Sequence, residues 1–265
     1  MDLILLFKAF ILGIVEGATE FLPISSTGHL IIAGDLLNFN DGKGKVFEIV
    51  IQLGAILAVC FEYRQRLVNT IKHMTNDASA QNFILNLFIS FLPAALLGLA
   101  FHDFIKQYLF SPITVAIALI VGGFVILFIE KFTQHSSTQQ IEAITKTQAF
   151  KIGLAQSLAL VPGVSRAGAT ILGGMVFGLT RQTATEFSFF LAIPIMFAAT
   201  GYDLLKSWDR LSMADLPMFA VGFITAFLSA LLVIKVLIKY VANHDFTAFA
   251  WYRIIFGTIV LAYFW

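Results

Sequence analysis

The chain has 265 residues, of which 58% are hydrophobic and 12% charged, and its formal net charge is +1. A soluble domain carries about a quarter charged residues, so this composition excludes an ordinary water-soluble domain and predicts a polytopic membrane protein. The small net charge gives no reason to expect a nucleic-acid partner. The single cysteine, Cys60, excludes an intrachain disulfide and a thiolate metal cluster.

Apolar stretches of membrane-spanning length occur along the whole chain, and the polar linkers between them are too short for a soluble domain. The sequence therefore predicts one integral membrane domain over residues 1–265. No basic leader precedes the first stretch, so we expect no cleaved signal peptide. The stretches are 3–22, 46–61, 83–101, 112–129, 149–162 continuing to 179, 184–202, 216–238 and 246–265.

Two of these stretches are interrupted by Pro, Gly and Ser. Stretch 3–22 runs into Pro23 and "ISSTGH", and stretch 149–162 runs into Pro162 and "GVSRAGAT". Irregular backbone is not tolerated against lipid, because each unpaired N–H or C=O group costs several kcal/mol there. Each interruption must be covered by protein or line a cavity. We therefore predict two re-entrant helical hairpins.

The two hairpins also resemble each other at an offset of 140 residues, where "AFILGIVEGATEFLPISSTGHLII" aligns with "AFKIGLAQSLALVPGVSRAGATIL". Three uninterrupted spans follow each hairpin. Because a re-entrant hairpin does not cross the membrane, each half crosses it an odd number of times. The second half must then enter from the opposite side. The sequence predicts an all-α inverted-topology repeat, with halves at 1–130 and 147–265, each one hairpin plus three transmembrane helices. Broken helices at matching positions predict a site near the bilayer midplane.

The orientation follows from the charges of the linkers. Linkers 62–82 and 130–148 hold three and two Lys or Arg residues, whereas 102–111 holds one. By the positive-inside rule the first two are cytoplasmic, which places both termini outside. Linkers 33–45 and 203–215 carry two basic residues each on the outer side and weaken this bias.

The first hairpin carries an acidic pair. Glu16 and Glu20 are four residues apart and share one face of a helix. Like charges at this spacing repel, so the pair needs a proton, a nearby cation or a metal ion. Carboxylates at membrane depth indicate a functional site. The alternative is a structural pair at a helix end that reaches the lipid headgroups.

Hydroxyl groups and an imidazole follow the first break. Ser25, Ser26, Thr27 and Gly28 lie at the expected N-terminus of a second helix, where exposed N–H groups favour an anion. His29 follows one turn after Ser26 and is a candidate base or nucleophile. The alternative is that the serines are N-caps and His29 is a core imidazole.

The second break supplies a cation. Arg166 is costly at membrane depth and suits two-pronged contact with phosphate or carboxylate. Gly163 and Gly168 allow close backbone approach, and Ser165 and Thr170 add hydroxyl donors. If the repeats face each other, Arg166 meets the polar groups of the first hairpin in a buried site for an anionic substrate.

Other polar residues have several interpretations. Arg166 has two structural alternatives, a snorkelling side chain or an ion pair with Glu186. Glu48 and Gln52 share a helix face and are expected to line the same cavity. Arg253, within the last span, is expected to pair with an acid.

The motifs "EGATEFLPISSTGH" and "PGVSRAGAT", with "TEFSFFLAIPIM" after the second, resemble the signatures of the undecaprenyl-diphosphatase family, the bacitracin-resistance proteins. The resemblance covers essentially the whole chain. It implies a multi-pass phosphatase of the bacterial inner membrane that cleaves a polyprenyl diphosphate to the monophosphate and inorganic phosphate. That reaction recycles the lipid carrier for cell-wall synthesis. A divalent cation, Mg²⁺ or Ca²⁺, and a site facing the periplasm are also implied.

Carried over residue by residue, the family's catalytic groups fall on Glu16, Glu20, Ser26, His29 and Arg166, with the two glutamates also as metal ligands. One departure is Ala167, where the family usually has a serine after the arginine, so phosphate contacts are expected to be fewer. The expected substrate contacts are Ser25, Thr27, Gly163, Ser165, Gly168, Thr170 and Gln52.

Two questions stay open from sequence. The nucleophile is Ser26, His29 or a water activated by His29. A transporter or flippase of an anionic lipid is the alternative function, because inverted repeats with paired hairpins are a transporter architecture. The expected partners are the polyprenyl diphosphate, membrane lipids and, with a homodimer left open, a second copy of the chain.

Overall fold

The computed structural model describes residues 3–39, 42–132, 137–206 and 213–265. These residues form α-helices joined by short turns, and no β-strand occurs among them. The helices are α1 (Leu3–Thr19), α2 (Ser26–Leu36), α3 (Gly42–Glu62), α4 (Arg64–His73), α5 (Ala78–Phe104), α6 (Pro112–Phe132), α7 (Lys146–Ser157), α8 (Arg166–Val176), α9 (Arg181–Lys206), α10 (Leu216–Val241) and α11 (Thr247–Phe264).

Six of the helices correspond to the six plain spans that the sequence predicts. Of the described helices, five (α5, α6, α9, α10 and α11) are long and apolar enough to cross a membrane by themselves. The sixth candidate span is α3 taken together with α4, which pass the same test as a pair. The chain bends by 71° between them. Large apolar side chains such as Phe128, Leu232 and Ile255 point outward from these helices, as expected where lipid surrounds the protein. The prediction of an all-α polytopic membrane protein is confirmed.

The two hairpins, α1–α2 and α7–α8, turn back at the predicted breaks. Pro23 and Pro162 lie in the breaks, which helices α2 and α8 follow. The residue just before each of these helices has a positive φ, 70° at Ser25 and 76° at Ser165. Positive φ is uncommon in residues other than glycine. The two breaks therefore share one unusual backbone conformation at positions that the 140-residue offset relates.

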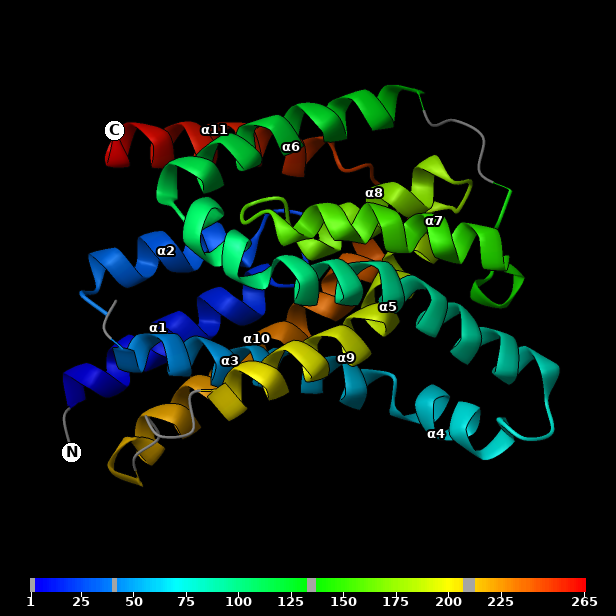
Figure 1. The fold of residues 1–265 in the computed structure, drawn as a ribbon, viewed down its shortest axis with the longest axis horizontal. Helices are drawn as coiled ribbons and strands as arrows, with labels where there is room; N and C mark the ends of the chain where they lie inside the picture. The colour runs from blue at the N-terminus through cyan, green and yellow to red at the C-terminus, as the bar shows by residue number, and fades with distance from the viewer. Residues whose placement is uncertain (1–2, 40–41, 133–136, 207–212) are drawn as a thin grey trace.

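Figure 1 shows that matching elements of the two halves run in opposite directions. Helix α1 enters from the left-hand end, beside the N-terminus, and α7 enters from the right-hand end. Helix α1 packs on α10, α7 packs on α5, and α6 packs on α11. Each hairpin thus rests on the second span of the other half. This is the arrangement expected for an inverted repeat, although the limits 1–130 and 147–265 stay a prediction.

Glycines allow the entering helices to lie close to these spans. A Cβ atom at Gly13 would lie 2.0 Å from the hydroxyl oxygen of Thr225 on α10. A Cβ atom at Gly153, the equivalent position in α7, would lie 2.5 Å from the carbonyl oxygen of Ser90 on α5. Small residues favour close helix packing in a membrane, where no hydrophobic force draws helices together. The matched glycines therefore allow each entering helix to pack closely on a span of the other half.

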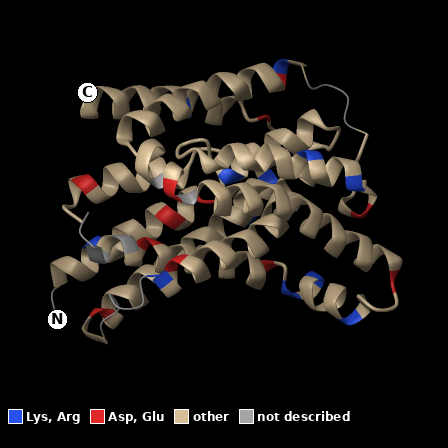
Figure 2. Cartoon of the chain, viewed as in Figure 1, with Lys and Arg blue, Asp and Glu red and all other residues tan. Residues whose placement is uncertain are grey.

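Basic residues gather at one end of the molecule. Helix α4, the end of α6 and the start of α7 lie at the right-hand end of Figure 1, and Figure 2 shows Lys and Arg there. They include Arg64, Arg66, Lys72, Lys131 and Lys146. Helix α4, which carries the first three of these residues, has no buried residue.

Candidate active site

A buried arginine of α11 joins the tips of the two hairpins. Arg253 is 1% exposed. Among the described residues, its side chain donates hydrogen bonds to backbone carbonyl groups alone. The expectation that Arg253 pairs with an acid was therefore wrong. Its acceptors are the carbonyl oxygens of Pro23 (3.0 Å), Ala118 (3.0 Å), Leu119 (3.3 Å), Gly163 (3.0 Å) and Val164 (2.9 Å). One guanidinium thus holds both breaks against α6.

Gly163 fits the second tip to the same helix. Its φ is +94°, and an added Cβ would lie 2.6 Å from the carbonyl oxygen of Val115 on α6. The backbone conformation and the close contact both require glycine here. Gly163 allows the close backbone approach that was predicted, but the group it approaches is α6. A direct contact of Gly163 with substrate stays a prediction.

The tips bring a hydroxyl, a carboxylate and a guanidinium together. The Ser26 hydroxyl donates to Glu20 Oε2 at 2.5 Å, and Arg166 Nη2 donates to Glu20 Oε1 at 3.2 Å. The side chains of Arg166 and Glu20 are 13% and 9% exposed. Hydrogen bonds to ionised groups are strong, and a low-dielectric surrounding strengthens them further. Glu20, Ser26 and Arg166, which lie up to 146 residues apart in the chain, form one connected cluster.

Helix α9 and the first hairpin hold the guanidinium of Arg166. Its Nη1 donates to the carbonyl oxygen of Ser188 at 3.1 Å, and its Cζ atom lies over the ring of Phe21, 5.6 Å from the ring centroid. Its acidic partner is Glu20, whereas Glu186 accepts a hydrogen bond from Gln182, so the proposed structural pair with Glu186 does not form. The Nε atom is buried and has no hydrogen-bond partner among the described residues. A bound anion could accept this hydrogen.

Thr170 supports Arg166 from within α8. Its hydroxyl donates to the carbonyl oxygen of Arg166 at 2.9 Å and shares a 2.6 Å hydrogen bond with the hydroxyl of Ser188. Ser165 is the N-cap of α8, because its hydroxyl oxygen accepts from the N–H of Gly168 at 3.0 Å. The three predicted substrate contacts Ser165, Gly168 and Thr170 thus make hydrogen bonds within the protein, and their contact with substrate stays a prediction.

Glu16 lies beside this cluster and is fully buried, with 0% exposure. Neither of its carboxylate oxygens has a hydrogen-bond donor within the described part of the chain. The carboxylates of Glu20 and Glu48 are close enough to act on it electrostatically. Burial of an unpaired carboxylate is costly, so this position is suited to a proton or a cation. Gln52, one turn beyond Glu48 on α3, is half-buried.

His29 is turned away from the cluster. Its Nδ1 lies 2.8 Å from the carbonyl oxygen of Ser25, and its Nε2 lies 2.6 Å from the hydroxyl of Tyr252 on α11. Its ring stacks on Phe256, with centroids 4.2 Å apart. Both ring nitrogens therefore contact groups other than Glu20 and Ser26. The role of His29 as base or nucleophile stays a prediction, and these contacts do not support it.

Residues 9–259 match the family described as bacitracin resistance protein BacA. The chain belongs to the BacA family. The match includes both hairpins and the α11 residues that hold their tips.

Curated relatives of this BacA-family protein carry the name undecaprenyl-diphosphatase. One from Methylobacillus flagellatus is 67% identical, with 100% of each chain covered. One from Nitrosomonas europaea is 60% identical over 98% of this chain and 95% of its own. A third, from Nitrosospira multiformis, is 60% identical over 98% of this chain and 96% of its own. The resemblance read from the two motifs is confirmed.

Sequence reasoning missed the residues that hold the BacA-family cluster in place. Ser188 lies in the quoted segment TEFSFFLAIPIM but was given no role there, and Tyr252 lies in an apolar span outside the motifs. Arg253 stood out as a charge in an apolar span, but its partners could not be predicted. Their partners come from other helices, so spacing along the chain could not reveal them. Thr27 is half-buried, and its predicted contact with substrate stays a prediction.

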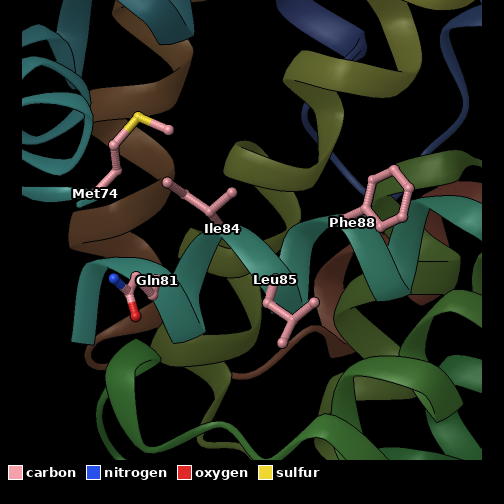
Figure 3. Close-up of a pocket in the computed structure, with 5 residues that line it drawn as sticks. All are labelled: Met74, Gln81, Ile84, Leu85 and Phe88. Carbon is pink, nitrogen blue, oxygen red and sulfur yellow. The ribbon is translucent and has the colours of Figure 1, made fainter. Parts of the chain in front are cut away.

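A separate surface hollow lies far along the chain from the motifs. It has a volume of about 310 Å³ and lies between the end of α4 and the start of α5. Figure 3 shows its lining, which is mostly apolar. The lining residues are Met74, Gln81, Ile84, Leu85 and Phe88. None of the predicted site residues lines this hollow, so it is not the candidate active site.

Proposed function

We propose that this chain hydrolyses undecaprenyl diphosphate to the monophosphate and inorganic phosphate in the bacterial plasma membrane. The product would return to cell-wall synthesis, and the activity would confer resistance to bacitracin. The observation that carries the proposal is the Glu20–Ser26–Arg166 cluster, formed where the two hairpin tips meet. The name shared by full-length relatives at 60–67% identity supports the substrate.

The cluster favours an enzyme over a transporter. A site that only binds an anion gains nothing from carboxylates beside it, because like charges repel. Here Glu20 instead accepts a hydrogen bond of 2.5 Å from a serine hydroxyl. A hydroxyl bonded to a carboxylate, with a guanidinium next to it, is the arrangement of an activated nucleophile beside an anion-binding group. The comparisons give no support to the transporter alternative.

We assign the steps to the chain's own groups as follows. Arg166 binds oxygens of the terminal phosphate, using the N–H that has no partner in the described chain. The oxygen of Ser26 attacks the terminal phosphorus while Glu20 accepts the serine proton. The bond to the bridging oxygen breaks, and the polyprenyl monophosphate leaves. Water then attacks the phosphorus of the phosphoserine, the bond to the Ser26 oxygen breaks, and the proton held by Glu20 returns to that oxygen as inorganic phosphate is released. Positioning and charge neutralisation are the main demands of such a transfer.

The acidic residues fit a divalent cation of the magnesium type. Among the described residues, no three His, Cys, Asp or Glu side chains are arranged to enclose a metal ion. Mg²⁺ is commonly held by one or two carboxylates together with substrate phosphates, and the buried, unpaired oxygens of Glu16 match that need. Glu20 lies beside it, although both of its oxygens already accept hydrogen bonds. A bound cation would neutralise charge on the diphosphate.

We also propose that the site opens toward the periplasm. By the positive-inside rule, the basic residues around α4 and α7 support a cytoplasmic position for the right-hand end of Figure 1. The first hairpin carries Ser26 and both acids, and its helix α1 begins at the opposite, left-hand end of Figure 1. In a Cys60→Ser background, Thr27→Cys should react with a membrane-impermeant thiol reagent in intact spheroplasts. Reaction only in inverted vesicles would contradict this orientation.

The experiment that tests the function is release of inorganic phosphate from undecaprenyl diphosphate by the purified chain in detergent. Wild type should release phosphate and Ser26→Ala should not, although Ser26→Ala should still bind the substrate. Ser157→Ala is the matched control, because it removes a hydroxyl from the second hairpin whose one hydrogen bond within the described part of the chain is to the carbonyl oxygen of Gly153. It should keep wild-type turnover.

Two further arms separate the alternatives. Glu16→Gln should raise the Mg²⁺ concentration needed for half-maximal turnover, and equal metal dependence would remove Glu16 from the metal site. A well-folded, metal-supplied wild type that releases no phosphate but binds the lipid would favour the transporter. Substantial turnover by Ser26→Ala would remove Ser26 as the nucleophile and leave direct attack by water.

A further inference from the structure

The contacts of His29 fix which of its nitrogens carries the hydrogen. The carbonyl oxygen of Ser25 can only accept, so the Nδ1 atom 2.8 Å away must donate to it. In the neutral imidazole Nε2 then holds the lone pair, and the Tyr252 hydroxyl, 2.6 Å away, donates to that nitrogen. The stacked rings of Phe256 and Tyr252 keep the imidazole in its plane. His29 is thus a fixed link between α11 and the first break.

The carbonyl that His29 holds belongs to the peptide that joins Ser25 to Ser26. Ser25 has the unusual φ of 70°, and its side chain makes no capping hydrogen bond to α2. The second break has such a bond, from the N–H of Gly168 to the Ser165 hydroxyl. The first break therefore depends on contacts other than a side-chain cap. The contact from His29 fixes the peptide that carries Ser26, whose hydroxyl meets Glu20.

Adjacent residues of α11 support this break at two points. Arg253 donates to the carbonyl oxygen of Pro23, and Tyr252 acts through His29 on the carbonyl oxygen of Ser25. We propose that Tyr252 is a positioning residue for the phosphatase reaction. Its hydroxyl orients His29, and His29 in turn orients the Ser25–Ser26 peptide so that the Ser26 hydroxyl meets Glu20. His29 then contributes as an orienting hydrogen-bond donor.

The first test removes one hydroxyl and keeps the ring. Tyr252→Phe should lower kcat about tenfold and leave KM within about twofold, because a displaced nucleophile slows the chemical step more than it weakens lipid binding. Tyr263→Phe is a matched control, because Tyr263 also lies on α11, is also exposed, and donates to Asp35 of α2. It should stay within about twofold of wild type. Unchanged kcat in Tyr252→Phe, or equal losses in both variants, would overturn the proposal.

The second test distinguishes an orienting donor from a base. The amide nitrogen of asparagine can replace Nδ1 as donor to the Ser25 carbonyl but cannot take up a proton. His29→Asn should therefore keep at least about a tenth of wild-type kcat, whereas His29→Ala should lose about a hundredfold. Adding Tyr252→Phe to His29→Asn should cause no further loss, since the two act in one chain of contacts. Equal loss in the Asn and Ala variants would restore His29 as base or nucleophile and overturn the proposal.

This inference rests on the proposed phosphatase activity, and the same assay separates the two failures. Wild type without phosphate release would remove the function itself. Active wild type with an unaffected Tyr252→Phe would remove only the role of Tyr252. The melting temperature of each variant in detergent shows whether it is folded. If a His29 variant does not fold, the kcat of Tyr252→Phe alone decides whether Tyr252 is a positioning residue.

Discussion

The two hairpins share a backbone and differ in chemistry. Each turns at a serine with positive φ, 70° at Ser25 and 76° at Ser165. The next residue begins a short helix in each case, and there the first hairpin has the hydroxyl of Ser26 and the second the guanidinium of Arg166. Both contact the carboxylate of Glu20. A duplicated scaffold thus brings two different groups to one point, because the halves enter from opposite sides.

The hairpins also differ in how their breaks are held. The second break has its own cap, since the N–H of Gly168 donates to the Ser165 hydroxyl. The first break has no side-chain cap and takes its support from His29 and from Arg253 of α11. Arg253 also holds the second break, so the difference is the local cap, which the half with the proposed nucleophile lacks.

The largest expected effect tests whether the second hairpin takes part in the chemistry. Arg166→Ala should lower kcat/KM by about 10²–10³-fold, the usual loss when a group that stabilises developing charge is removed. Arg166→Lys should recover only part of this, because an ammonium cannot contact Glu20 and Ser188 with a planar fork. Phosphate release measures both. Turnover near wild type in Arg166→Ala would confine the site to the first hairpin.

The next effect concerns the residue that joins the two breaks. Arg253→Leu should lower the free energy of unfolding by roughly 3–5 kcal/mol, because five carbonyl groups lose a hydrogen bond from the guanidinium and three of these bonds are buried. Thermal melting in detergent would show the loss as a lower midpoint. Thr258→Ala, an exposed change on the same helix, is the control. Equal midpoints for the two variants would mean that the tips hold together without Arg253.

A smaller loss is expected at the second tip alone. Gly163→Ala should cost about 2 kcal/mol, because alanine is strained at φ +94° and its Cβ would lie 2.6 Å from the carbonyl oxygen of Val115. Gly201→Ala is the control, since nothing lies within 4 Å of a Cβ there. Chemical denaturation in mixed detergent would compare them. A stable Gly163→Ala would show that α6 can move away from this tip.

The smallest effect sharpens the contrast between the caps. Ser165→Ala should cost about 1 kcal/mol, the usual value for the loss of an N-cap. Ser25→Ala should cost less, because the Ser25 side chain makes no capping hydrogen bond. The two variants change the same residue type in the same backbone conformation, so each is the control for the other. Equal melting midpoints would mean that the Ser165 cap contributes nothing measurable.

Much of the architecture could be predicted from particular residues. Pro23 and Pro162 within apolar stretches indicate the breaks, because a break at membrane depth must be covered by protein. The offset that aligns Ser25 with Ser165 indicates an inverted repeat, and that symmetry places Arg166 beside the acids of the first hairpin. The contact of Arg166 with Glu20 is thus accessible from sequence, once the repeat is recognised.

The sequence by itself determined the membrane class, the two hairpins and the residue types at the site, because hydrophobic length, proline breaks and buried charge are properties of the chain. Only the tertiary structure decided which partner each polar group has. Arg253 bonds carbonyl groups of three segments and His29 bonds Ser25 and Tyr252. Every residue has a backbone carbonyl. The sequence therefore does not show which carbonyls accept these hydrogen bonds, because the packing of the helices decides it.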